Sequence, residues 1–186
     1  MSPVTHFLSG WVFANCFDLD RRDRALITWA AVVPDIDGVG AVAEVLTRNS
    51  EHPWTWFSQY HHSLHTLWFA LFCSMLAMIV ARRRWFTGAM VFVAFHLHLL
   101  GDLLGARGPD GYAWPIPYLW PVGSVSLSWN GEWPPNSWQN LVITLALLGI
   151  SAWIIRAKGR SPVEPFSLSA DRAVVAAFRK RMHAAI

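Results

Sequence analysis

The stretch that decides the fold is FHLHLLGDLLG, residues 95–105, at the end of a long apolar run. The run predicts a membrane-spanning helix, yet it carries His96, His98 and Asp102 within seven positions. An ionised side chain is costly in the core of a bilayer and by default marks a functional site. The stretch therefore predicts a membrane helix with a polar site at its end.

The composition favours an integral membrane protein of one main domain. Of the 186 residues, 54% are hydrophobic, only 15% are charged and 12 are tryptophan, whereas soluble domains carry about 25% charged residues. The net charge is +3 and the basic residues stand in short clusters. Because no long basic face is present, no nucleic-acid partner is expected. Membrane lipid is the expected partner, and the sequence leaves the oligomeric state open.

Apolar segments predict an all-α, multi-pass helical bundle over residues 1–160, followed by a basic amphipathic tail over residues 161–186. The expected helices cover residues 7–17, 25–34, 64–81, 85–104 and 141–155. The first two have only about ten residues, whereas about 20 are needed to span a hydrocarbon core. A polar turn is predicted over residues 18–24, and the PDIDGVG stretch is predicted to interrupt the second helix. The connection over residues 105–138 is rich in Gly, Pro and Trp, and its indole rings suit the head-group layer.

The basic clusters at residues 21–24, 82–84 and 156–160 predict the topology. The positive-inside rule places all three on the cytoplasmic side of the membrane. The opposite helix ends then meet on the extracytoplasmic side. They bring together a set of histidines and aspartates: His6, Asp35, Asp37, His62, His98 and Asp102.

His98 and Asp102 are four residues apart and lie about 40° apart around a helix axis. This spacing suits either joint metal binding or a hydrogen-bonded structural pair. His96 lies about 200° from His98 around the same axis. It is therefore expected to face another helix or lipid.

Asp35 and Asp37 flank Ile36 in the PDID motif. Two carboxylates so close together repel each other unless a cation or hydrogen-bond donors lie between them. Metal ligation is favoured here over a solvated loop.

The segment YHHSLHT, residues 60–66, offers three more histidines: His61, His62 and His65. Pairs of them have helical spacing, so at least one is a candidate ligand and another is expected to be positioning or structural. His6 stands alone in the sequence and by itself suggests a helix-end histidine.

A mixture of His and Asp ligands without cysteine suits zinc, manganese or iron better than a structural zinc site. Such an ion lowers the pKa of a bound water and supplies a hydroxide nucleophile. Asp37 and Asp102 are the candidate catalytic carboxylates beside it. No HExxH motif, GxSxG motif or P-loop is present.

Five short motifs occur in a recognisable order: Thr5-His6, PDID at 34–37, HSL at 62–64, HLLGDLL at 98–104 and Trp120-Pro121. Together they resemble the membrane-bound metal-dependent hydrolase family, small bacterial inner-membrane proteins similar to zinc-dependent phospholipase C. The resemblance covers about residues 1–125. It implies an all-helical fold with zinc as the first choice of divalent metal. It also implies metal contacts from His6, Asp35, Asp37, His62, His98 and Asp102.

The resemblance thus raises His6 from a bystander to a ligand and selects His62 from the histidine cluster. Two departures stand out. The family has threonine at the position of His61 and also at the position of Gly105.

The leading hypothesis is a membrane-embedded, metal-dependent hydrolase of ester or phosphoester bonds, acting on a lipid or lipid-linked substrate. A second hypothesis is a non-catalytic metal-binding membrane protein, such as a sensor, a scaffold or part of a permease. A third is a bundle in which His and Asp make only structural hydrogen bonds.

Overall fold

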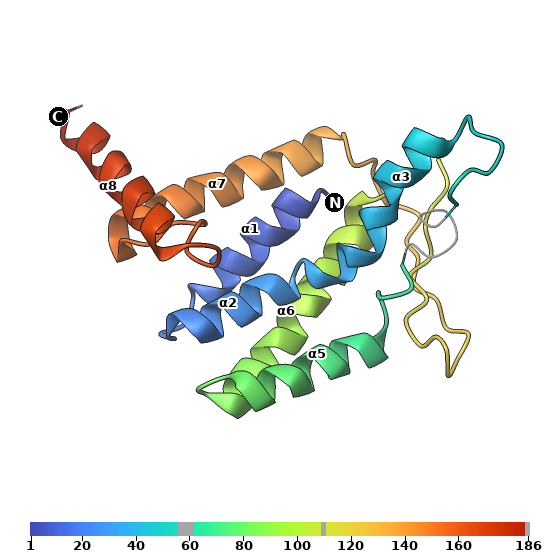
Figure 1. The fold of residues 1–186 in the computed structure, drawn as a ribbon, viewed down its shortest axis with the longest axis horizontal. Helices are drawn as coiled ribbons and strands as arrows, with labels where there is room; N and C mark the ends of the chain where they lie inside the picture. The colour runs from blue at the N-terminus through green and yellow to red at the C-terminus, as the bar shows by residue number, and fades with distance from the viewer. Residues whose placement is uncertain (56–61, 109–110, 185–186) are drawn as a thin grey trace.

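The computed structural model describes residues 1–55, 62–108 and 111–184, and within them the predicted all-α fold is confirmed (Figure 1). The only β pairing in these residues is an isolated bridge between Ile116 and Leu127. The helices are α1 (Pro3–Ala14), α2 (Arg21–Ala30), the 3-10 helix η1 (Val33–Val39), α3 (Gly40–Thr47), α5 (Leu67–Val80), α6 (Arg84–Gly105), α7 (Trp138–Lys158) and α8 (Leu168–Ala184).

The first two helices begin earlier than predicted because a polar side chain caps each of them. The Ser2 hydroxyl accepts the N–H of Thr5 at 3.2 Å. The Asp20 carboxylate accepts the N–H of Asp23 at 2.9 Å. Such caps satisfy backbone donors that have no partner within the helix. The predicted turn over residues 18–24 is therefore wrong, since its RRDR stretch forms the first turn of α2.

The second helix is interrupted as predicted, but before Pro34 rather than at it, and the helical structure of PDIDGVG itself and of the segment after it was missed. α2 ends at Ala30, and the chain continues as the short η1 and then α3. Pro34 lacks an N–H and cannot continue a regular helix. α2 and the η1–α3 segment are bent by 52°, and together they have the length and composition of one broken membrane span. The aspartates of the PDID motif lie in η1, just after this break.

α6 is the central helix of the bundle and packs against α1, α2, α5 and η1 (Figure 1). Its contact with α5 is close because a small residue lies at the crossing. The Ser74 hydroxyl donates to the carbonyl of Gly88 at 2.8 Å. A Cβ on Gly88 would lie 2.4 Å from Cγ of Met78. Small residues at helix crossings are typical of membrane bundles.

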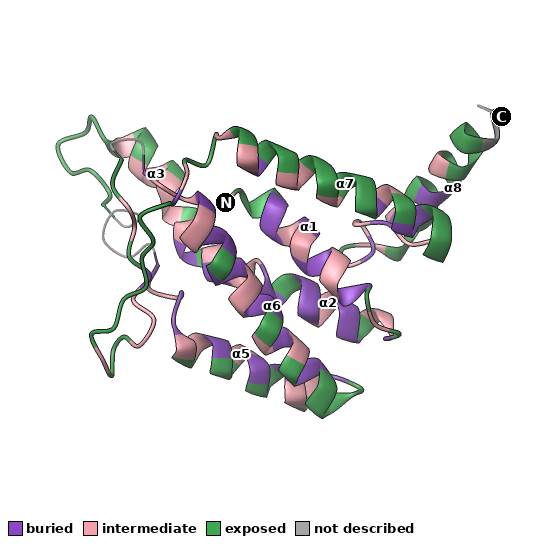
Figure 2. Cartoon of the chain, turned by 180° about the vertical axis from the view of Figure 1, so that it is seen from behind, coloured by how far each residue is buried: buried purple, intermediate pink, exposed green. Residues whose placement is uncertain are grey.

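α6 and α7 are each long and apolar enough to cross a membrane, and the broken pair is a third candidate span. α7 contacts α1 on one side. Its other side is exposed over most of its length (Figure 2). This exposed face carries Leu141, Leu145, Leu148 and Trp153. A continuous apolar face of this kind suits contact with lipid.

Buried polar contacts tie the predicted basic clusters together at the end of the bundle opposite the break. The Asp23 carboxylate accepts the N–H groups of Arg82 and Arg83, each at 2.9 Å, and the hydroxyl of Thr87. Arg24 forms a buried ion pair with Glu164, in the segment before α8. The start of the predicted tail is therefore anchored to α2.

Candidate metal centre

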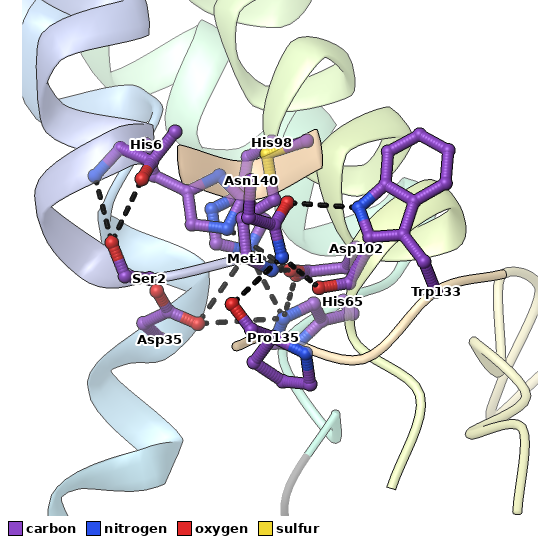
Figure 3. A network of polar contacts seen from close by, with 12 residues as sticks. Met1, Ser2, His6, Asp35, His65, His98, Asp102, Trp133, Pro135 and Asn140 are labelled. Atoms are coloured by element: carbon purple, nitrogen blue, oxygen red, sulfur yellow. Dashed lines mark hydrogen bonds and ion pairs between the residues drawn. The ribbon is translucent and has the colours of Figure 1, made fainter. Parts of the chain in front are cut away.

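Four side chains from distant parts of the chain converge at the other end of the bundle (Figure 3). Asp35 lies in η1, His65 lies just before α5, and His98 and Asp102 lie on α6. One ligand atom from each lies within 4.8 Å of all the others. His65, His98 and Asp102 are buried, and Asp35 is partly exposed.

The distances between these atoms suit a single small cation. Ligands at about 2.0–2.1 Å around a tetrahedral ion lie roughly 3.3 Å from one another. The Nε2 atom of His98 lies 3.1 Å from Nε2 of His65 and 2.9 Å from Oδ2 of Asp102. The Nε2 atom of His65 lies 3.4 Å from Oδ2 of Asp102, and Oδ1 of Asp35 lies 3.6–3.9 Å from the two imidazoles. The donor set fits a divalent metal ion.

His98 is oriented by the backbone at the end of α2, through the capping residue Ala31. Its Nδ1 lies 3.0 Å from the carbonyl oxygen of Ala31, which can only accept, so Nδ1 carries a proton. In the neutral ring Nε2 then presents a lone pair toward the cluster, as a metal ligand does. The predicted pairing of His98 with Asp102 one turn later is confirmed in geometry.

His65 is fully buried and lies between Asp102 and Asp37. Its Nδ1 is 3.6 Å from Oδ2 of Asp37, and the same oxygen accepts the N–H of Leu64 at 3.1 Å. His65 lies outside the candidate spans. Burial disfavours its charged form, but its contacts with the Asp102 and Asp37 carboxylates outweigh burial and raise the pKa of His65 to about 9. A cation binding here would replace that proton.

Asp35 supplies an independent sign of a missing ligand. Its Oδ2 atom is buried, and no hydrogen bond from the described residues reaches it. A buried carboxylate oxygen without a donor is costly. Its position beside three further ligands is consistent with metal binding.

Asp37 does not join the four ligand atoms, although the sequence predicted it as a ligand and a catalytic residue. It lies behind His65, where it orients the imidazole. A carboxylate behind a histidine ligand is a common device in metal sites, because it holds the ring and raises its basicity.

His6 also lies beside the four-atom group rather than within it. Its Nε2 is 3.0 Å from Oδ1 of Asp102, the oxygen turned away from His98, and its ring lies 3.9 Å from that of His98. Gly101 permits this approach, since a Cβ there would lie 2.9 Å from Cε1 of His6. His6 thus orients Asp102.

His62, which the resemblance selected, lies outside the four-atom group, and His65 takes part instead. The ring of His62 lies 4.5 Å from that of His65 and 5.7 Å from that of Trp114. Its backbone has a φ of 77°, which is uncommon for residues other than glycine. The histidine cluster marked the right segment, but helical spacing did not apply to a turn. His61 lies outside the described residues.

His96 faces away from the cluster, as its angle on the helix predicted. Its Nε2 lies 2.8 Å from the hydroxyl of Tyr118.

The cluster forms part of the wall of a cavity of about 860 Å³. Its lining includes Asp35, His62, Asp102, Arg107, Trp114 and Pro134–Asn136. The Pro134 side of the cavity is held by Asn140 of α7, whose amide donates to the carbonyls of Gly105, Pro134 and Pro135.

Trp133 completes this support by donating its indole N–H to the Asn140 side chain at 3.0 Å. A Cβ on Gly105 would lie 2.6 Å from both Asn140 Oδ1 and Trp133 Nε1. The glycine that departs from the family pattern therefore fits this packing. Of the remaining tryptophans in the connection, Trp120, Trp129 and Trp138 are exposed.

The apolar exterior and the buried His–Asp cluster define a helical membrane protein with a candidate metal centre. A model of the YdjM inner membrane protein family matches residues 1–182. The chain belongs to this family of bacterial inner-membrane proteins. A search of curated proteins found no match, and a search of solved structures found none.

Proposed function

We propose that the protein is a metal-dependent hydrolase of ester or phosphoester bonds that works at the membrane surface. The observation that carries this proposal is the convergence of four ligand atoms within 4.8 Å at the wall of a large cavity. A site buried without access would suit a structural ion, whereas this one adjoins space for a substrate.

The ligands we assign are Asp35, His65, His98 and Asp102. Their neighbours have positioning roles: Asp37 orients His65, and His6 orients Asp102. Zinc is our first choice, with manganese or iron as alternatives. A divalent ion held there supplies Lewis-acid chemistry, lowering the pKa of water and offsetting negative charge on a phosphoryl or carbonyl oxygen.

The protein's own part in the reaction is to position groups and to accept a proton. Asp35 and Asp102 line the cavity, so each has a carboxylate next to the reacting groups. Oδ2 of Asp35 has no donor among the described residues, so it is available as the proton acceptor. We assign this role to Asp35 rather than to Asp37, whose Oδ2 contacts Leu64 and His65.

The membrane setting supports a lipid or lipid-linked substrate. The cavity lies at the end of α6 remote from Arg84. The chain that follows α6 carries the exposed tryptophans Trp120 and Trp129. Indole rings favour the head-group layer. By the positive-inside rule we place the site on the extracytoplasmic side of a multi-pass protein.

The direct test is to purify the full chain in detergent and determine bound metals by elemental analysis. The zinc- and manganese-loaded protein is then assayed with mixed phospholipids and with a soluble phosphodiester. We expect about one metal ion per chain and turnover that is lost in Asp102→Ala, while His96→Ala serves as a control for a histidine outside the cluster. Cleavage of the soluble diester without cleavage of any lipid would refute the lipid substrate. Retained metal without any turnover would refute the hydrolase and favour a metal-binding sensor or scaffold.

A further inference from the structure

Arg107 brings a permanent positive charge to the cavity wall, five residues after Asp102. Its Nη2 donates to the carbonyl of Asn130 at 2.7 Å. Its Nε is buried and has no acceptor among the described residues. A guanidinium has five N–H donors in a fixed fork, so part of its donor capacity is unused.

The backbone around Arg107 is fixed from both sides. Its N–H donates to the carbonyl of Trp133 at 3.2 Å, and the N–H of Trp133 donates to the carbonyl of Leu104 at 2.9 Å. The residue therefore joins the end of α6 to the wall that Asn140 supports. These backbone bonds fix the point from which the side chain extends, and the bond from Nη2 to Asn130 restrains the side chain itself.

Glu132 is an acidic residue near Arg107, but the two side chains are not in direct ion-pair contact. The described residues contain no ion pair within 4.0 Å between the two. Glu132 is itself buried, and burial raises its pKa even though the charge of Arg107 opposes the rise. Arg107 carries a positive charge on the wall of a cavity that also includes Asp102, Trp114 and Pro134.

We infer that Arg107 binds an oxyanion of the substrate, so that the cavity takes a phosphoester with an apolar part rather than a neutral ester. The planar fork of arginine matches a phosphate oxygen pair. A neutral ester offers one uncharged carbonyl acceptor, which gives the fork neither a matching oxygen pair nor an opposite charge. This inference rests on the proposed function for the reaction, but the binding of an anion is independent of turnover.

The first test measures binding of inorganic phosphate to the detergent-purified full chain, metal-free and zinc-loaded, by titration calorimetry. We expect Arg107→Gln to weaken phosphate binding about ten- to a hundredfold, since hydrogen bonds between charged groups are lost. Arg84→Gln is the matched control, because Arg84 is exposed at the other end of α6. Arg107→Lys keeps the charge but loses the fork, and we expect it to bind phosphate more weakly than wild type. Unchanged affinity in Arg107→Gln overturns the inference. If that variant does not fold, unchanged affinity in Arg107→Lys overturns it.

The second test compares a soluble phosphodiester, phosphatidylglycerol vesicles and a neutral carboxylic ester as substrates. We expect Arg107→Gln to raise KM at least tenfold for whichever phosphodiester is cleaved and to change KM for the neutral ester less than twofold. Preference for the vesicles or for the soluble diester identifies the source of the phosphate, and either preference with this KM pattern supports the inference.

The two proposals fail in different ways. Loss of phosphate binding in Arg107→Gln without turnover of any substrate by the wild type would uphold the anion site and refute the hydrolase. Turnover with an unchanged diester KM and unchanged phosphate affinity in Arg107→Gln would uphold the hydrolase and refute the anion site.

Discussion

Replacing His65 and His62 by alanine, one at a time, tests which of the two histidines is a metal ligand. Nε2 of His65 lies 3.1 Å from Nε2 of His98 and 3.4 Å from Oδ2 of Asp102, as two ligands of one ion do. His62 lies next to His65 but outside the four-atom group. We therefore expect His65→Ala to lose zinc and His62→Ala to keep it.

The expected loss of zinc affinity depends on whether the replaced residue is a ligand or only orients one. Loss of a residue that only orients a ligand costs about 10- to 100-fold in metal affinity. Loss of the ligand itself should weaken zinc binding at least about 100-fold, which corresponds to about 2.7 kcal/mol. We expect His62→Ala to change zinc affinity by less than about tenfold, because its ring lies beside the four-atom group and supplies none of its ligand atoms.

Chelator competition gives the zinc affinity, and thermal unfolding checks it independently. At a zinc concentration of about 100 times the wild-type Kd, zinc stabilises the wild type by about 2.7 kcal/mol. A hundredfold weaker site at the same concentration leaves about 0.4 kcal/mol in His65→Ala. Metal-free unfolding midpoints control for damage to the fold, and His96→Ala controls for loss of a histidine elsewhere on α6. Full zinc stabilisation in His65→Ala together with its loss in His62→Ala would show that the four-atom group is not the metal site.

Four further predictions follow from the contacts. Asp37→Asn should weaken zinc binding about 10- to 100-fold in chelator competition without abolishing it, because Asp37 orients His65; unchanged affinity would contradict this role. Since His65 carries a proton up to a pKa of about 9, zinc must displace it, and zinc affinity should rise roughly tenfold from pH 7 to pH 8; a flat profile would rule out His65 as a ligand. Gly105→Thr should lower the unfolding free energy by about 1–3 kcal/mol, because its Cβ would meet Asn140 at 2.6 Å; an unchanged unfolding midpoint would argue against this packing. Asp23→Ala should lower stability by about 1–3 kcal/mol by leaving buried donors unsatisfied, while zinc affinity stays within twofold because Asp23 lies at the opposite end of the bundle.

The helical core of the protein was predictable from local pattern. The helices expected over residues 64–81, 85–104 and 141–155 correspond to α5, α6 and α7, with ends that differ by a few residues. The pairing of His98 with Asp102 was also predictable. Helix geometry alone places residues four apart on one face, and a long apolar run excludes most alternatives to a helix. The basic clusters indicated which helix ends lie together at the end of the bundle that carries the histidines and aspartates.

The tertiary structure alone decided which histidine and which aspartate join the centre. His65 is selected over His62 by the turn at residues 62–64, where His62 has a φ of 77°, and Asp35 over Asp37 by the 3-10 turn of η1. The turn has no repeating geometry, and the 3-10 helix has three residues per turn, so neither α-helical nor extended spacing gave these side-chain directions. Arg107 lies on the same cavity because residues after α6 pair with the chain near Trp133. Spacing along a sequence sets side-chain directions only where the backbone is regular, and elsewhere packing between distant segments sets them.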